Sequence, residues 1–170
     1  MSPLARSSSG FTLLEVVIVV AIIGIVASVT LVNIPNWLNT LEARRAVRQV
    51  ASTLQYVRFR AVSTNLEYRV RFFADGANYL IEKKDAFLGW VGEGFPMDLP
   101  SSVVFNRGGG DPVTFPGDAV TFRPDGSLGG LSGGLYFLGG SQARYRITVL
   151  SATGRVRLER GWGPYEPPSP

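Results

Sequence analysis

The chain contains 170 residues, with no Cys and no His, and its 17 basic and 13 acidic residues give a formal net charge of +4. Without Cys it can form no disulfide, no thiol nucleophile and no Cys-based metal site. Without His it can form no Ser-His-Asp triad, no His-ligated metal site and no imidazole base. Most common enzyme mechanisms thereby lose a key group, although an enzyme that works with carboxylates alone is compatible with this composition.

The first long apolar run covers residues 11–32 and contains a single charged residue, Glu15. A helix of this length measures about 33 Å, enough for a bilayer core of about 30 Å. The polar run at residues 7–10 precedes the apolar run, whereas the cleavage site of a secretory signal follows it. We therefore predict a membrane-spanning helix over residues 11–35, which Pro35 is expected to kink or interrupt.

Glu15 is the informative residue of this segment, because a carboxylate in an apolar span costs about 2.5–3.5 kcal/mol. No Lys or Arg lies between Phe11 and Asn33, so no side chain there can neutralise it. Cleavage after Gly10 would create an α-amino group at Phe11, one helical turn from Glu15. That amine could pair with Glu15 of its own chain or of a neighbour. The alternative is an uncleaved signal anchor that holds Glu15 among the lipid headgroups.

A second, amphipathic helical segment is predicted over residues 36–64. Its apolar residues recur three and four positions apart, which places them on one helical face; they are Leu38, Leu41, Val47, Val50, Leu54, Val57 and Ala61. The five Arg residues of this segment lie largely off that face. We expect the apolar face to pack on the domain that follows and the helix to end near Thr64 and Asn65.

Residues 65–160 are predicted to form an antiparallel β domain. Residues 66–74 alternate apolar and basic side chains, a turn follows at residues 75–78, and residues 79–83 return, as in a hairpin. Further strands are expected at residues 103–105, 119–122, 135–137, 145–150 and 155–159. The predicted fold class is α+β, with one long helix whose second half packs on an antiparallel sheet. The Pro-rich tail, residues 161–170, is expected to be irregular.

The run from Gly10 to Glu15 (GFTLLE), followed by the uncharged segment, resembles the class III signal of type IV pilins and pseudopilins. The resemblance implies that prepilin peptidase removes the leader, residues 1–10, and that Phe11 becomes N-methylated. It also implies that Glu15 acts in assembly, by neutralising the N-terminus of a neighbouring subunit. The implied location is the bacterial inner membrane with a cytoplasmic N-terminus, and then a periplasmic pseudopilus or a surface pilus. Arg44, Arg45 and Arg48 weaken the charge bias expected for that orientation.

Two stretches near the other end resemble the GspH/FimT group of minor pilins and pseudopilins. They are residues 120–126 (VTFRPDG), similar to an F-x-P-x-G element, and residues 147–157 (ITVLSATGRVR), similar to a closing hairpin. The resemblance implies a filament subunit without cofactor or catalytic role, with other pilin subunits as partners. It fits a minor type IV pilin or an H-type pseudopilin of a type II secretion system. A membrane-tethered enzyme or receptor is the alternative class. Residues 84–118 contain no recognisable motif.

The last hairpin gathers basic residues. Period-two alternation places Arg144 with Arg146 on one strand face and Arg155 with Arg157 on the other strand's face. If both faces point outward, four Arg crowd one surface that can hold phosphates, with Glu159 as the nearby acid. In the FimT branch a Gly-Arg-x-Arg stretch like residues 154–157 is associated with DNA capture, which implies DNA as a partner. The alternative is a solubilising face, or one that meets acidic groups of other subunits.

Two other patterns carry no site. Glycines 108–110 lack the Gly-Lys-Ser/Thr sequence and the strand–loop–helix context of a phosphate-binding loop. Asp111, Asp118 and Asp125 lack the spacing of an EF-hand and are expected to form turns. No metal site is predicted.

Overall fold

The structure is a computed structural model that describes residues 11–30 and 34–161. It divides into two compact units, residues 1–37 and residues 38–170. The predicted leader, Gly10 included, and the predicted tail after Gly161 lie outside the described residues.

The first unit contains helix α1 (Leu13–Thr30), whose apolar side chains are exposed on every side. Each large hydrophobic residue from Leu13 to Val26 is at least 50% exposed. Among the described residues, neither helix combines the length and the hydropathy that a membrane crossing requires. The span predicted for residues 11–35 includes residues 31–33, for which no structure is described, and it stays a prediction.

Helix α2 (Ile34–Thr64) supplies one wall of the second unit's core. Pro35 lies in its first turn, where a backbone N–H has no helical partner in any case, so proline is tolerated there. The predicted apolar face is confirmed from Val47 onward, where Val47, Val50, Leu54, Val57 and Ala61 are fully buried. Leu38 was placed on that face but is 52% exposed. Three alanines that the pattern did not single out complete the buried face, namely Ala43, Ala46 and Ala51.

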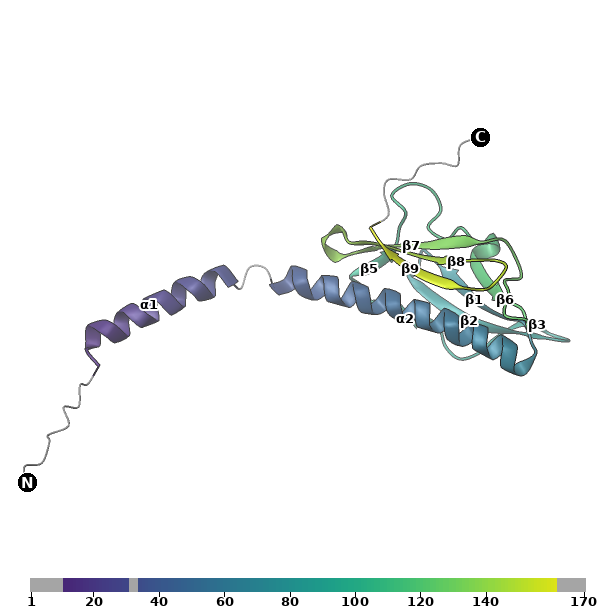
Figure 1. The fold of residues 1–170 in the computed structure, drawn as a ribbon, viewed down its shortest axis with the longest axis horizontal. Helices are drawn as coiled ribbons and strands as arrows, with labels where there is room; N and C mark the ends of the chain where they lie inside the picture. The colour runs from purple at the N-terminus through teal and green to yellow at the C-terminus, as the bar shows by residue number, and fades with distance from the viewer. Residues whose placement is uncertain (1–10, 31–33, 162–170) are drawn as a thin grey trace, which may run out of the picture. The chain divides into compact units, whose positions relative to one another are not determined.

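The β strands follow α2 and form two antiparallel sheets (Figure 1). The first sheet contains β1 (Tyr68–Phe73), β2 (Asn78–Asp85), β3 (Gly89–Gly92), β4 (Met97–Asp98) and β6 (Ala119–Phe122). Its order is β3-β2-β1-β6, and β4 also pairs with β2. The second sheet has the order β5-β7-β8-β9, formed by β5 (Val103–Phe105), β7 (Gly133–Gly139), β8 (Arg144–Val149) and β9 (Val156–Arg160). Short 3-10 helices, Pro116–Asp118 and Gly140–Gln142, precede β6 and β8.

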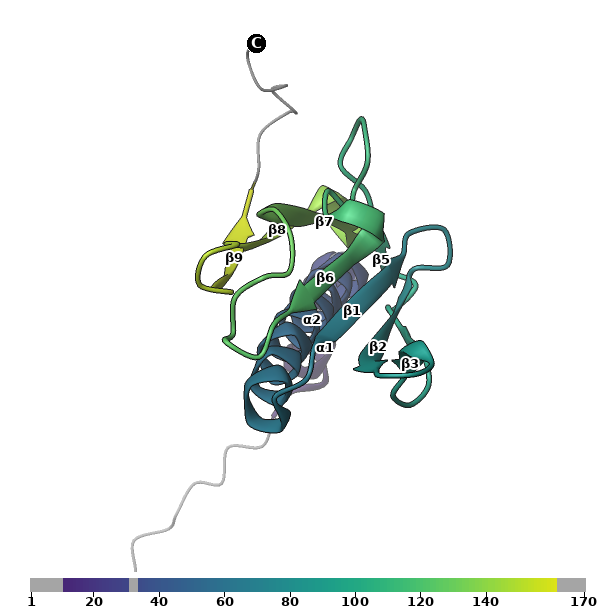
Figure 2. The ribbon, with the colours of Figure 1, turned by 90° about the vertical axis from the view of Figure 1, so that its right-hand side faces the viewer.

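The two sheets and α2 share one core, with α2 lying along both sheets in Figures 1 and 2. An aromatic contact joins the sheets, since the ring centroids of Phe105 in β5 and Phe72 in β1 lie 5.8 Å apart. Within the second sheet, the ring centroid of Phe105 lies 5.1 Å from that of Phe137 in β7. The buried core begins at Ala43 and ends at Val149. Because the whole buried core of the described residues lies within the second unit, we expect a soluble body starting at Leu38 to fold on its own. The predicted α+β class is confirmed, with the strands divided between two sheets.

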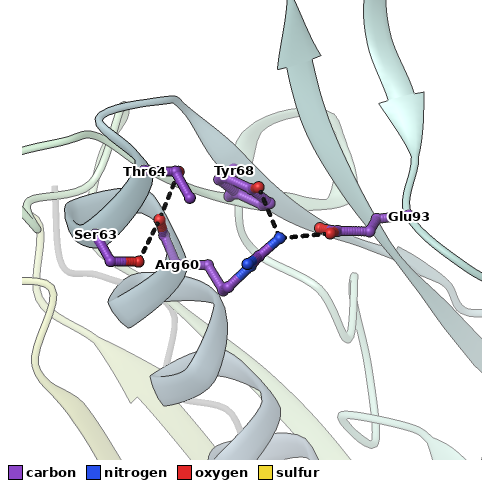
Figure 3. A network of polar contacts seen from close by, with 5 residues as sticks. All are labelled: Arg60, Ser63, Thr64, Tyr68 and Glu93. Atoms are coloured by element: carbon purple, nitrogen blue, oxygen red, sulfur yellow. Dashed lines mark hydrogen bonds and ion pairs between the residues drawn. The ribbon is translucent and has the colours of Figure 1, made fainter.

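A polar network closes the C-terminal end of α2 (Figure 3). Arg60 Nη2 donates hydrogen bonds to Glu93 Oε1 at 2.6 Å and to Tyr68 Oη at 3.3 Å. The hydrogen bond and the charge of the Glu93 carboxylate raise the pKa of Arg60 further above its usual range. Thr64 Oγ1 and Ser63 Oγ donate to the Arg60 carbonyl, and Asn65 then adopts φ 55°, a common helix ending. The predicted end of the helix at Thr64–Asn65 is confirmed.

Candidate functional site

The N-terminal residues of α1 form a capping arrangement around Glu15. Thr12 Oγ1 accepts a hydrogen bond from the Glu15 backbone N–H at 3.2 Å, and Glu15 is the third residue of the helix. Thr-x-x-Glu is the capping-box pattern, in which the side chain before the helix satisfies an otherwise unpaired N–H. A carboxylate in the first turn also interacts favourably with the helix dipole. The sequence reading missed Thr12, although the T-x-x-E spacing before an apolar run was visible.

The β8–β9 hairpin places the four predicted Arg residues on the outward side of the second sheet. The register pairs Arg146 with Glu159 and Thr148 with Arg157, so these side chains share one face. Tyr145, Ile147 and Val149 alternate with them and are buried. The Leu150 N–H donates to the Arg155 carbonyl at 3.2 Å, so the pairing extends to Arg155, just before β9, and strand alternation gives Arg155 the same side as Arg157. The predicted sharing of a face is therefore confirmed for this hairpin.

The four Arg residues are not equivalent. Arg146 is half-buried and donates through Nε to Glu159 Oε2 at 2.8 Å, with a second bond from Nη2 to the same oxygen. This pairing raises the pKa of Arg146 above its usual range. Arg144 is also half-buried. Arg155 and Arg157 are exposed, and within the described residues their side chains make no hydrogen bond or ion pair. Of the four predicted Arg residues, Arg155 and Arg157 therefore present unpaired guanidinium groups to solvent, whereas Arg146 is paired with Glu159.

A fifth basic residue that the sequence reading did not select, Arg58 of α2, lies beside this hairpin. Its Nε donates to the Gly126 carbonyl at 3.0 Å. Gly126 and Gly154 both have positive φ, at 80° and 60°, and a Cβ added to Gly154 would lie 2.1 Å from the Gly126 oxygen. The two motif turns are therefore packed directly against each other and against Arg58. No local pattern could have shown this contact, because it joins three segments far apart in the sequence.

The turn that carries Gly126 is held by Asp125. Its Oδ1 accepts bonds from the Ser127 N–H at 2.8 Å and the Ser127 hydroxyl at 2.6 Å. These bonds lower the pKa of Asp125, since they favour the ionised carboxylate. The predicted turn role of Asp125 is confirmed. In the described parts of the chain, no group of three or more acidic residues could hold a metal ion.

An open cleft of about 540 Å³ lies between α2 and the start of β9. Its lining is formed by Gln55, Arg58, Phe59, Val62, Gly154, Arg155 and Val156. Phe59 is 66% exposed and Val62 is 51% exposed, so the cleft has an apolar wall, and two Arg residues, Arg58 and Arg155, also line it. Such a surface can bind anionic or mixed acidic and apolar groups, and it contains no arrangement of nucleophile and base.

Comparison with known proteins bears on both ends of the chain. Residues 5–31 match a family described as the prokaryotic N-terminal methylation motif, and residues 46–154 match a family described as type II transport protein GspH. No curated protein matches the sequence.

Solved structures with a similar fold include two filament proteins. The minor pseudopilin EpsH from the type 2 secretion system of Vibrio cholerae has a TM-score of 0.56 and 16% identity, covering 70% of this chain and 97% of that chain. The type IV minor pilin FimU of Pseudomonas aeruginosa has a TM-score of 0.56 and 17% identity, covering 76% of this chain and 99% of that chain. The pilin-like fold expected from the sequence is thus confirmed. Because the GspH match covers more than half of the chain, this protein belongs to the GspH family of minor pilin-type subunits.

Proposed function

We propose that this chain is a minor subunit of a pilus or pseudopilus that is inserted in the inner membrane and then drawn into the filament. The observation that carries this proposal is the methylation motif of residues 5–31 joined to a GspH domain. Prepilin peptidase cuts after Gly10, Phe11 is methylated, and residues 11–35 provide first the membrane anchor and then the assembly surface. An apolar surface on every side of α1 supports this, because such a helix is normally covered by lipid or by other helices.

Glu15 is proposed to attract the new N-terminal amine of a neighbouring subunit during assembly. The observation in support is that Glu15 is the only charged residue between Phe11 and Asn33. In apolar surroundings an unpaired carboxylate and an unpaired amine are each costly, so bringing them together favours the docked subunit.

A type IV pilus with a role in DNA uptake is the first of two candidate machines. The exposed Arg155, just before β9, and Arg157, within β9, support it, because unpaired guanidinium groups can each bind a phosphate. The net charge of +4 also favours an anionic partner such as DNA. Arg144 and Arg146 are assigned a supporting role, since Arg146 is already paired with Glu159.

The DNA proposal predicts that Arg157→Gln weakens DNA binding by the soluble body, and that adding Arg155→Gln abolishes it at moderate salt. Each lost phosphate contact should also flatten the dependence of log K on log salt by about one unit. Gel shifts over a salt series measure both effects. Arg71→Gln is the matched control, because it removes one positive charge from an exposed position on the other sheet. Equal DNA retention by the double variant and by the control would exclude the contact.

A type II secretion pseudopilus is the second candidate, favoured by the description of the matching family and by the likeness to EpsH. The two machines are separated by deleting the gene and complementing it. Loss of surface pili and of transformation, with secretion of folded proteins intact, supports the pilus. The reverse result supports the secretion system.

A further inference from the structure

Within residues 34–161, one edge of strand β9 pairs with no other strand and forms its free edge. The strand ends the four-stranded sheet, and β8 is its neighbour there. The Leu150 N–H bonds to the Arg155 carbonyl and the Gly161 N–H bonds to the Arg144 carbonyl. In an antiparallel pair, alternate residues face the partner strand, so residues 155, 157, 159 and 161 face β8. The N–H and C=O groups of Val156, Leu158 and Arg160 therefore point away from β8 at the outer edge seen in Figure 2.

Apolar side chains lie beside this edge. Val156 lines the cleft together with Phe59 and Val62 of α2. Leu158, next on the same face of β9, is 40% exposed, although its partner Ile147 on β8 is fully buried. The second sheet thus ends before the apolar surface beneath it is covered. One more strand would extend the sheet over that surface.

The surroundings of the edge carry positive charge. Arg155 and Arg157 are exposed on the outward face of the hairpin, and Arg58 lies in the cleft. Helical spacing places Arg44 and Arg48 on the same side of α2 as Phe59, and both are exposed. None of these five side chains forms an ion pair with a described residue, and Glu159 is taken by Arg146. Charges of one sign along an edge repel a basic strand and attract an acidic one.

We propose that the free edge of β9 and the adjacent side of α2 form a docking site for an extended, acidic segment of another filament subunit. The segment adds to the sheet as a further strand and bonds to the backbone groups of Val156, Leu158 and Arg160. Its acidic side chains, on the outward face, lie beside Arg155 and Arg157. Its apolar side chains alternate with them and cover Phe59 and Val62. This proposal rests on the proposed filament membership and does not require that DNA binds.

The test uses the soluble body from Leu38 onward and three synthetic peptides of about seven residues, a typical strand length. One alternates Glu and Val, one alternates Lys and Val, and one is the Glu–Val peptide with a central Pro. The expected result is binding of the first peptide at least tenfold tighter than of the other two. Amide hydrogen exchange should show new protection at Val156, Leu158 and Arg160, while Arg157 and Glu159 are protected beforehand.

Two matched variants separate strand addition from attraction by charge. Leu158→Pro removes an N–H that faces the free edge and leaves the bonds to β8 in place, and an edge strand tolerates proline. Leu158→Ala removes the apolar side chain but keeps that N–H. Binding of the Glu–Val peptide should fall at least tenfold further in Leu158→Pro than in Leu158→Ala. If Leu158→Pro does not fold, amide hydrogen exchange of the unmodified soluble body with the Glu–Val peptide bound tests the proposal instead.

Four results would overturn the proposal. The first is equal binding of the Lys–Val peptide, and the second is equal binding by the two Leu158 variants. The third is protection absent from the three free-edge amides while the peptide is bound. Binding of single-stranded DNA in the cleft with no binding of the acidic peptide would likewise replace it with a nucleic-acid site.

Discussion

A Glu15→Gln variant should be produced, processed and retained in the membrane, yet be almost absent from the filament. The substitution removes the only negative charge between Phe11 and Asn33, so the N-terminal amine of a neighbouring subunit would lose its counter-charge. A charge in an apolar environment costs about 2.5–3.5 kcal/mol. Since about 1.4 kcal/mol corresponds to a factor of ten, incorporation should fall tenfold or more. Immunoblots of sheared filaments against membrane fractions measure the ratio.

The structure makes this substitution specific. Glu15 is the third residue of α1, and Thr12 accepts a hydrogen bond from its N–H. Gln at that position preserves a capping box, so Glu15→Gln removes the charge without weakening the start of the helix. Thr12→Val is the complementary control, because it removes the cap, at a cost of about 1 kcal/mol, and keeps the charge. Normal incorporation of Glu15→Gln, or an equal defect in Thr12→Val, would refute the proposed role of the carboxylate.

The second large effect is expected for Gly154→Ala. Gly154 has φ 60°, and an added Cβ would lie 2.1 Å from the Gly126 carbonyl oxygen and 3.0 Å from Arg58 Nε. The left-handed conformation alone costs an alanine about 1–2 kcal/mol. The contact with backbone adds to this, because the two turns must separate and the bond from Arg58 to Gly126 must stretch. We expect the soluble body to lose about 3 kcal/mol or more of unfolding free energy.

Urea unfolding of the soluble body measures this loss. Gly161→Ala is the matched control, since Gly161 has φ 73° and no atom of the described residues lies within 4 Å of the added Cβ. It should lose only about 1–2 kcal/mol, the cost of the conformation by itself. Equal losses in the two variants would show that the packed turns contribute nothing to stability.

Elements with a strong local pattern were predictable. The spacing of Val47, Val50 and Leu54 marked the buried face of α2, and the alternation around Val70 marked β1. The strands β3 and β4 were missed because both are short and lie between Gly and Pro residues, without alternation. Leu38 was misplaced because periodicity gives the direction of a side chain but not where the packed domain ends.

The division into two sheets and the shape of the cleft were not predictable. The pairing of β1 with β6 and of β5 with β7 is decided by tertiary packing between distant segments. The register that places Arg146 opposite Glu159 depends on the number of residues in the turn between β8 and β9. Because that register pairs Arg146 with Glu159, the exposed Arg155 and Arg157 remain as the candidates for phosphate binding. The packing of the two turns brings Arg58 of α2 beside them.

The proposal as a whole depends on processing at one peptide bond, which mass spectrometry of the protein isolated from its native membrane tests directly. The account predicts a mature chain that begins at Phe11 and carries one methyl group on its α-amino nitrogen. A mature chain that begins at Met1 would contradict it.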